Sequence, residues 1–219
     1  MRMRAVLSRA ALVSGLSVLV LLHTSSALSE SSPTKPTRVA AADAKDALDV
    51  AHFSADGQLM KPADLTQWVF LGASLGMGYN QTTFNPASPG QFQVVLMEPN
   101  AYRYFMEHGK YAPGSMFLLS FYNADSHRSI NQVGYVQADL TNFEIHLVDA
   151  RKAPEEGRAF YVFGGPATQA RALPKGSECV RCHAGHGAFD GTFAQFYPTI
   201  RGHIPPEALE RALKDHDIR

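Results

Sequence analysis

The chain has 219 residues, with 20 basic and 20 acidic side chains and a formal net charge of zero. This balance gives no electrostatic argument for a nucleic-acid or membrane-surface partner, so we expect neither. With two cysteines and enough residues to bury a core, the fold does not depend on a disulfide framework.

The first 27 residues have the order of a secretory signal peptide. Basic residues occur between Met1 and Arg9, an apolar run extends from Ala10 to Leu22, and Ser25-Ser26-Ala27 supplies small residues for cleavage. The apolar run is shorter than the ~20 residues that a permanent membrane helix needs. We therefore expect residues 1–27 to be removed, the mature protein to be periplasmic, and no stable membrane anchor to remain.

The next segment, residues 28–50, is rich in Ser, Pro, Thr and Ala without apolar periodicity, which predicts a flexible lead. A single domain is expected over residues 51–219. Its first predicted element is a short amphipathic helix from Ala63 to Leu71, with Asp64 near its start and Gly72 behind it.

The middle of the chain predicts strands around one helix. Phe92–Met97 has the composition of a buried strand, and Pro99–His108 predicts a helix that ends at Gly109. Further strands are expected at residues 115–122, 132–138, 143–148 and 159–163. Because Gly, Asn and Asp separate these runs at short spacing, antiparallel pairing is favoured over βαβ crossovers.

After Gly164 we expect short helical pieces at residues 168–173, 179–183 and 190–197, and a closing helix from Pro205 to His216. The predicted fold class is therefore α+β, a mainly antiparallel sheet with short helices and a helical C-terminal segment.

The sequence Cys179-Val180-Arg181-Cys182-His183 has the C-x-x-C-H spacing of c-type haem attachment. Two thiols on one helical turn can each add to a haem vinyl group, while the adjacent imidazole binds the iron. Random placement of two cysteines and nine histidines gives this pattern with a probability below about 0.1%. We expect one covalent haem c, held by Cys179 and Cys182 with His183 as the iron ligand, so that the C-terminal helical segment binds haem.

Two other interpretations of the motif stay open. A C-x-x-C redox pair or a simple disulfide suits an exported protein, but the context lacks the strand-then-helix order of thioredoxins and leaves His183 unexplained. A structural zinc site would need four ligands, which only His186 or His203 could complete.

Aromatic residues follow the motif at helical spacing, at Phe189, Phe193 and Phe196/Tyr197. Ordinary core packing and packing against a haem edge both explain this stripe. We take Phe193 as a candidate haem contact.

Further motifs accompany the haem motif on both sides. They are Pro99-x-Ala101-Tyr102, Gly109-x-Tyr111-x-x-Gly114-Ser115 and Asp190-x-x-Phe193-x-x-Phe196-Tyr197-Pro198. With them the chain closely resembles the cytochrome P-460 family, which includes cytochrome c′-beta, from about Ala51 to Arg201. The resemblance implies a largely antiparallel β fold, often a homodimer, and a five-coordinate haem with an open distal face and His183 on the proximal side.

At two positions the sequence differs from the family pattern. The named family member oxidises hydroxylamine with a haem that is cross-linked to a lysine, and counting from Gly114 places Leu119 at that position. No lysine occurs between Ser115 and Glu144. An arginine of the family's distal pocket corresponds to Gln93. Both changes remove positive charge, so the resemblance favours the gas-binding behaviour of cytochrome c′-beta.

Strand alternation puts Ser115 and Phe117 on the same face as Leu119. If this face meets the haem, Phe117 and Leu119 build an apolar distal wall that admits neutral diatomic ligands. The alternative is that these side chains simply fill the core of the sheet.

The sequence therefore predicts a periplasmic mono-haem cytochrome that binds small neutral gases such as nitric oxide, transfers electrons to an unidentified periplasmic redox partner, or does both. The alternative is a haem oxidoreductase acting on hydroxylamine, nitrogen oxides or peroxide. That enzyme would need a polar distal group, for which Gln93, Tyr79 and His127 are candidates. A pure electron carrier would need a stable sixth ligand, and the methionines available for it are Met77, Met97, Met106 and Met116.

Overall fold

A computed structural model describes residues 46–78, 85–127, 129–153 and 156–214 of the chain. The signal peptide predicted for residues 1–27 and most of the lead predicted for residues 28–50 lie outside the described residues. Among the residues described, no helix has both the length and the apolar character needed to span a membrane.

The chain forms seven strands, four α-helices and two 3-10 helices within the described ranges. In chain order they are β1 (Leu59–Met60), the 3-10 helix η2 (Leu65–Gln67), β2 (Val69–Leu75), β3 (Gln91–Met97), α1 (Pro99–His108), β4 (Ser115–Asp125), β5 (Val136–Val148), β6 (Arg158–Gly164), β7 (Gln169–Ala170), α2 (Glu178–His186), the 3-10 helix η3 (Ala194–Phe196), α3 (Pro198–Arg201) and α4 (Pro206–Lys214).

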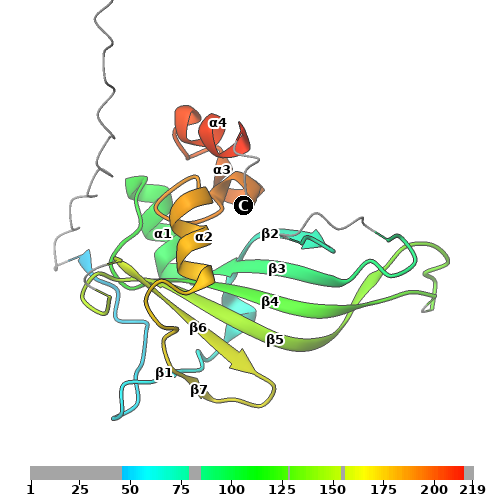
Figure 1. The fold of residues 1–219 in the computed structure, drawn as a ribbon, viewed down its shortest axis with the longest axis horizontal. Coiled ribbons are helices and arrows are strands. Elements are labelled where there is room, and N and C mark those ends of the chain that lie inside the picture. Colours follow the sequence, from blue (N-terminus) through cyan, green and yellow to red (C-terminus); the bar gives the residue numbers. More distant parts are fainter. Residues whose placement is uncertain (1–45, 79–84, 128, 154–155, 215–219) are drawn as a thin grey trace, which may run out of the picture. The chain divides into compact units, whose positions relative to one another are not determined.

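The strands β2 to β6 form one five-stranded sheet in sequence order, and each neighbouring pair is antiparallel. The short strands β1 and β7 pair in a second, two-stranded sheet. The four α-helices lie on one side of the large sheet, and β1 and β7 lie on the other (Figure 1). The predicted α+β class with antiparallel sheets and short helices is confirmed.

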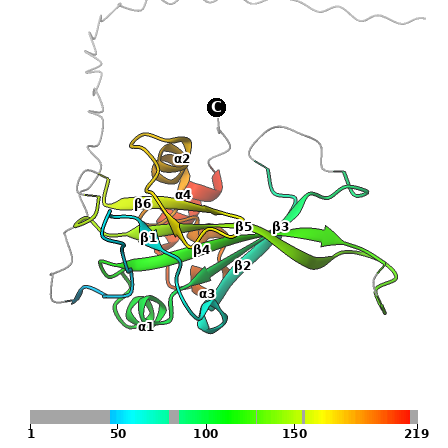
Figure 2. The ribbon, with the colours of Figure 1, turned by 90° about the horizontal axis from the view of Figure 1, so that it is seen from below.

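Each face of the large sheet buries its own core, because alternate side chains of a strand point to opposite faces. On the helix side, Met97, Phe117 and Val148 pack with side chains from α1, α3 and α4. On the other side, Met116, Leu118, Phe143, Ile145 and Leu147 pack under the N-terminal segment that contains Phe53 and Trp68. Figure 2 shows the layers from below. The helix-side face is the one that carries the candidate site.

Helix α1 matches its predicted bounds of Pro99–His108. The Glu98 carboxylate caps its first turn by accepting a hydrogen bond from the Ala101 backbone N–H at 2.8 Å. Gly109 ends the helix at a φ of 66°, a left-handed conformation that glycine adopts without strain.

The prediction of a helix over Ala63–Leu71 is wrong. Only Leu65–Gln67 forms a single 3-10 turn, after which Val69–Leu75 continues as strand β2. The strand pairs along its length with β3, and these ladder hydrogen bonds outweigh the weak local helical preference. Gly72 lets the strand approach the later chain closely, since a Cβ there would lie 2.7 Å from the Phe196 carbonyl oxygen.

Two further expectations differ from the structure. The strands expected at residues 132–138 and 143–148 are one long strand, β5, whose pairing with β4 contains register shifts near Tyr122. The helical piece expected at residues 168–173 is instead the short strand β7, which pairs with β1.

Candidate functional site

Helix α2 carries the C-x-x-C-H motif on one of its faces. Its nine residues place Cys182 three positions and His183 four positions after Cys179, which is the spacing of neighbours on one helical face. Val180 is buried and anchors the helix to the protein. Both cysteines are free thiols and are partly accessible.

The imidazole of His183 is fixed through one of its two nitrogens. Its Nδ1 lies 2.7 Å from the Gly191 carbonyl oxygen. Because a carbonyl only accepts hydrogen bonds, Nδ1 carries the proton and the Nε2 lone pair is left for another partner. Burial lowers the pKa of His183 to about 4, with the nearby Arg158 charge adding to it and the Gly191 hydrogen bond opposing it. The imidazole is therefore neutral near pH 7, as a metal ligand must be.

Three rings surround the His183 imidazole. The ring centroids of Phe193, Phe160 and His146 lie 4.5, 4.6 and 5.1 Å from it. Phe160 and His146 come from β6 and β5, while Phe193 follows α2 in the chain. The predicted haem contact Phe193 thus lies directly against the predicted iron ligand.

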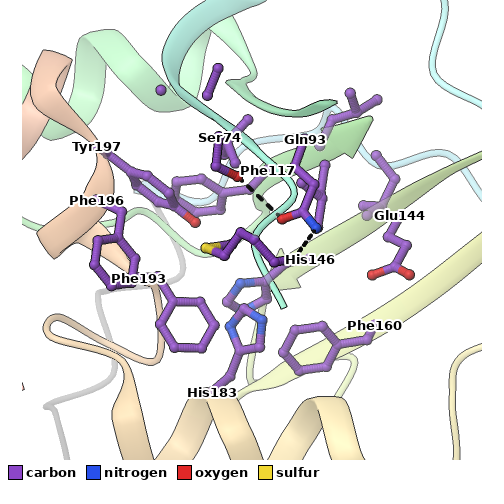
Figure 3. A pocket seen from close by; sticks show the side chains of 17 residues that line it. Ser74, Gln93, Phe117, Glu144, His146, Phe160, His183, Phe193, Phe196 and Tyr197 are labelled. Carbon is purple, nitrogen blue, oxygen red and sulfur yellow. Dashed lines mark hydrogen bonds between the residues drawn. The ribbon is translucent and has the colours of Figure 1, made fainter. Parts of the chain in front are cut away.

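A hollow opens between α2, the helix-side face of the sheet and residues 193–197. Its empty volume, open solvent included, is about 720 Å³. It is lined by Gly72, Ala73, Ser74, Met77, Gln93, Val95, Phe117, Leu118, Leu119, Glu144, Ile145, His146, Phe160, His183, Phe193, Phe196 and Tyr197. Figure 3 shows His183 and Gln93 approaching this hollow from opposite sides.

The strand register explains the apolar part of the wall. Leu119 pairs with Val95 of β3 on one side and with Glu144 of β5 on the other. Phe117 lies two residues earlier on the same face of β4, and both Phe117 and Leu119 line the hollow together with His183. Ser115 is buried on this face, but it is not among the lining residues.

Gln93, the position matched to the family's distal arginine, lies in the wall with its amide already bonded. Its Nε2 donates to the Met77 carbonyl oxygen at 3.0 Å, and its Oε1 accepts a hydrogen bond from Ser74 Oγ at 3.4 Å. The side chain therefore ties the end of β2 and the residues after it to β3 (Figure 3). It adds a polar group to the wall without adding charge.

Glu144 is a second polar lining residue, and the sequence analysis did not single it out. Burial raises the pKa of its carboxyl above the usual value. Alternation along residues 143–148, applied opposite Leu119, would have placed it on this face. The hollow is thus apolar along Phe117 and Leu119 and ionisable at Glu144.

His146 is another residue that the sequence analysis missed. Its side chain is buried, its Nε2 has no hydrogen-bond partner, and its ring stacks on Phe160 at 4.5 Å. Burial, followed by the proximity of His183 and Arg158, holds its pKa well below the usual value. A neutral imidazole therefore stands beside His183.

The sequence also offered polar distal candidates and methionines as sixth ligands. His127 is exposed between β4 and β5, and Tyr79 lies outside the described residues. Of the four methionines considered as sixth ligands, Met77 lines the hollow, whereas the other three, Met97, Met106 and Met116, pack in the two cores.

The residues present fit a covalently held haem. Two free thiols on one helical turn and an imidazole whose Nε2 is unprotonated form a suitable donor set, and a mostly apolar hollow borders the imidazole. The zinc interpretation finds no comparable support, because no group of three His, Cys, Asp or Glu side chains that could hold a metal ion occurs within the described residues.

One comparison with known proteins identifies a family. The Cytochrome P460 family model matches residues 62–194, which run from before β2 through α2 to Ala194 and cover more than half of the chain. A search of curated proteins found no match.

Proposed function

The chain belongs to the cytochrome P460 family and is therefore a haem-binding cytochrome, and we propose that it is an exported cytochrome with one covalent haem c that binds small neutral ligands and exchanges single electrons. Family membership supports the haem. The covalent attachment, the ligand class and the location are the proposal.

The attachment is assigned to α2. Cys179 and Cys182 would hold the haem through thioethers, which form by addition of S–H across a vinyl C=C bond and need no oxidant or reductant. His183 would bind the iron through Nε2, because its Nδ1–H bond to Gly191 orients the ring. The haem supplies an iron position for a small ligand and a one-electron couple.

One observation carries the choice of ligand. The hollow that His183 borders has Phe117, Leu119 and Val95 on its sheet wall, and no lysine is among its lining residues. Without a lysine the cross-link of the hydroxylamine-oxidising relative cannot form at this wall. The apolar part of the wall, at Phe117, Leu119 and Val95, favours neutral diatomic ligands over ions.

We predict that the ferrous protein is five-coordinate, binds nitric oxide and shows negligible hydroxylamine oxidation. Absorption spectra with and without nitric oxide measure the first two, and the mass of the haem peptide tests the attachment. A haem joined to the chain by a lysine as well as by Cys179 and Cys182 would refute the assignment of Leu119.

A size change at Leu119 tests the same wall. Leu119→Phe narrows the hollow, so carbon monoxide should associate severalfold more slowly with the ferrous protein. Leu140→Phe is the matched control, because Leu140 lies on β5 outside the hollow and is 47% exposed. Equal slowing in both variants would count against Leu119 as a distal residue.

Glu144 favours a second function, a haem oxidoreductase acting on hydroxylamine, nitrogen oxides or peroxide. A carboxyl whose pKa is raised by burial can take up and release a proton beside a bound substrate. We expect any turnover in the wild type to fall at least tenfold in Glu144→Gln, while nitric oxide binding persists. Absence of turnover in the wild type with all three substrate types would eliminate this function.

The location and partners complete the proposal. Residues 1–27 would direct export to the periplasm and would then be removed, so that the haem can exchange electrons there with a redox partner. Because members of the family are often homodimers, the chain is a candidate to form one. The N-terminal sequence of protein purified from the periplasmic fraction tests the export, and a mature chain that retains Met1 would contradict it.

A further inference from the structure

Arg158, the first residue of β6, is a buried cation on the His183 side of the site. It pairs with Val148 across the sheet, and only 17% of its side chain is exposed. Its Nε is buried without a hydrogen-bond partner. Its ion pair with Asp190 is long, at 3.5 Å between Nη2 and Oδ1. A charge that is desolvated and so weakly paired is costly to stability, so a role beyond folding is worth testing.

The Arg158 guanidinium occupies the space that a side chain at Gly191 would need. A Cβ at Gly191 would overlap the Arg158 guanidinium, Nη1 most of all. Gly191 has a φ of 67° and Asp190 a φ of 42°, so two successive left-handed residues form the turn. Glycine at 191 thus both permits the turn and lets the cation lie against it.

This turn carries the hydrogen bond that orients the predicted iron ligand. The Gly191 carbonyl oxygen accepts from His183 Nδ1 at 2.7 Å. Arg158, the Gly191 peptide and the His183 ring are therefore linked by direct contacts.

We propose that Arg158 is a positioning residue that holds the Gly191 carbonyl against His183 and, through its charge, raises the reduction potential of the haem, with Asp190 as a partial counter-charge. The inference rests on the proposed function, because it takes His183 as the iron ligand. A nearby cation stabilises the ferrous iron, which carries one positive charge fewer than the ferric iron. The Asp190 carboxylate acts in the opposite direction.

The test compares Arg158→Met, Asp190→Asn and the double variant in the haem-loaded protein at one fixed pH. In Arg158→Met we expect the ferrous-to-ferric ratio at a fixed ambient potential to fall about tenfold, equivalent to about 59 mV for one electron. In Asp190→Asn the ratio should rise, and in the double variant it should lie between the two. Spectroelectrochemical titration measures all three.

A separate measurement tests whether Arg158 positions the His183 ring. The resonance Raman iron–histidine stretch of the ferrous protein should shift in Arg158→Met and should be partly restored in Arg158→Lys, which keeps the cation but not the planar fork. If Arg158→Met does not fold, Arg158→Lys and Asp190→Asn still test the inference.

Shifts of the same sign in Arg158→Met and Asp190→Asn would show a merely structural role and would overturn the proposal, as would unchanged potentials. A haem stain and a pyridine haemochrome spectrum are recorded for every variant. A wild type without covalent haem refutes the proposed function, whereas haem-loaded variants of unchanged potential refute this inference alone.

Discussion

Replacing both Cys179 and Cys182 with alanine should abolish covalent haem completely. Each thioether needs its own sulfur, and the chain contains no third cysteine. A denaturing gel stained for haem measures the result, because haem that is bound without a covalent link dissociates when the chain unfolds. A stained band in the double variant would contradict the attachment site.

The single variants provide the matched controls. Cys179→Ala and Cys182→Ala should each retain a haem joined by one thioether. Mass spectrometry of the haem peptide, which identifies the remaining sulfur, separates the two. If one single variant already loses all haem, that cysteine alone supports attachment and the two-thioether assignment is wrong.

The second large effect is expected for His183→Ala, which should keep the haem attached and change its spin state and ligand affinity. The iron then loses the nitrogen that the Gly191 hydrogen bond orients. Ferrous spectra and carbon monoxide titrations measure the change. Added imidazole should partly restore the wild-type spectrum, because it can occupy the space that the side chain leaves.

Two other histidines provide the comparison. His186→Ala, on the same helix, should leave the spectra unchanged. If His183→Ala itself leaves them unchanged, another residue binds the iron. His146→Ala would then be tested together with His186→Ala. The His146 ring centroid lies 5.1 Å from that of His183, and His146 Nε2 has no hydrogen-bond partner.

The C-x-x-C-H motif could be recognised from the sequence because its residues are close together in the chain. Cys179, Cys182 and His183 form one local motif, and a single helical turn brings them to one face. Phe117 and Leu119 needed only the alternation of one strand. For Phe117 and Leu119 local geometry was sufficient to predict that the side chains share a face, and both line the hollow.

The missed residues depend on pairings between distant segments. Glu144 and His146 reach the hollow because β5 pairs with β4 in one register, and the shifts near Tyr122 make that register hard to count from the turn. Arg158 meets Asp190 across 32 residues of sequence. No periodicity within one segment indicates such a contact.

The secondary structure was likewise predicted correctly where its signals are local and wrongly where distant segments decide it. Helix α1 was predicted correctly because Pro99 and Gly109 mark its ends locally. The segment from Ala63 to Leu71 was predicted wrongly because β3, more than 20 residues later, provides the ladder that makes Val69–Leu75 a strand. Local preference was outweighed by tertiary pairing.

The order of segments along the chain has a consequence for maturation. The wall that carries Phe117 and Leu119 is complete before the cysteine motif is synthesised, whereas Phe193, Phe196 and Tyr197 follow it. When the chain is made from its N-terminus, every strand of this wall and both thiols are synthesised before the residues of the opposite wall. The haem that we propose at Cys179 and Cys182 would therefore meet strands that are already synthesised, and the last residues of the chain would cover it afterwards.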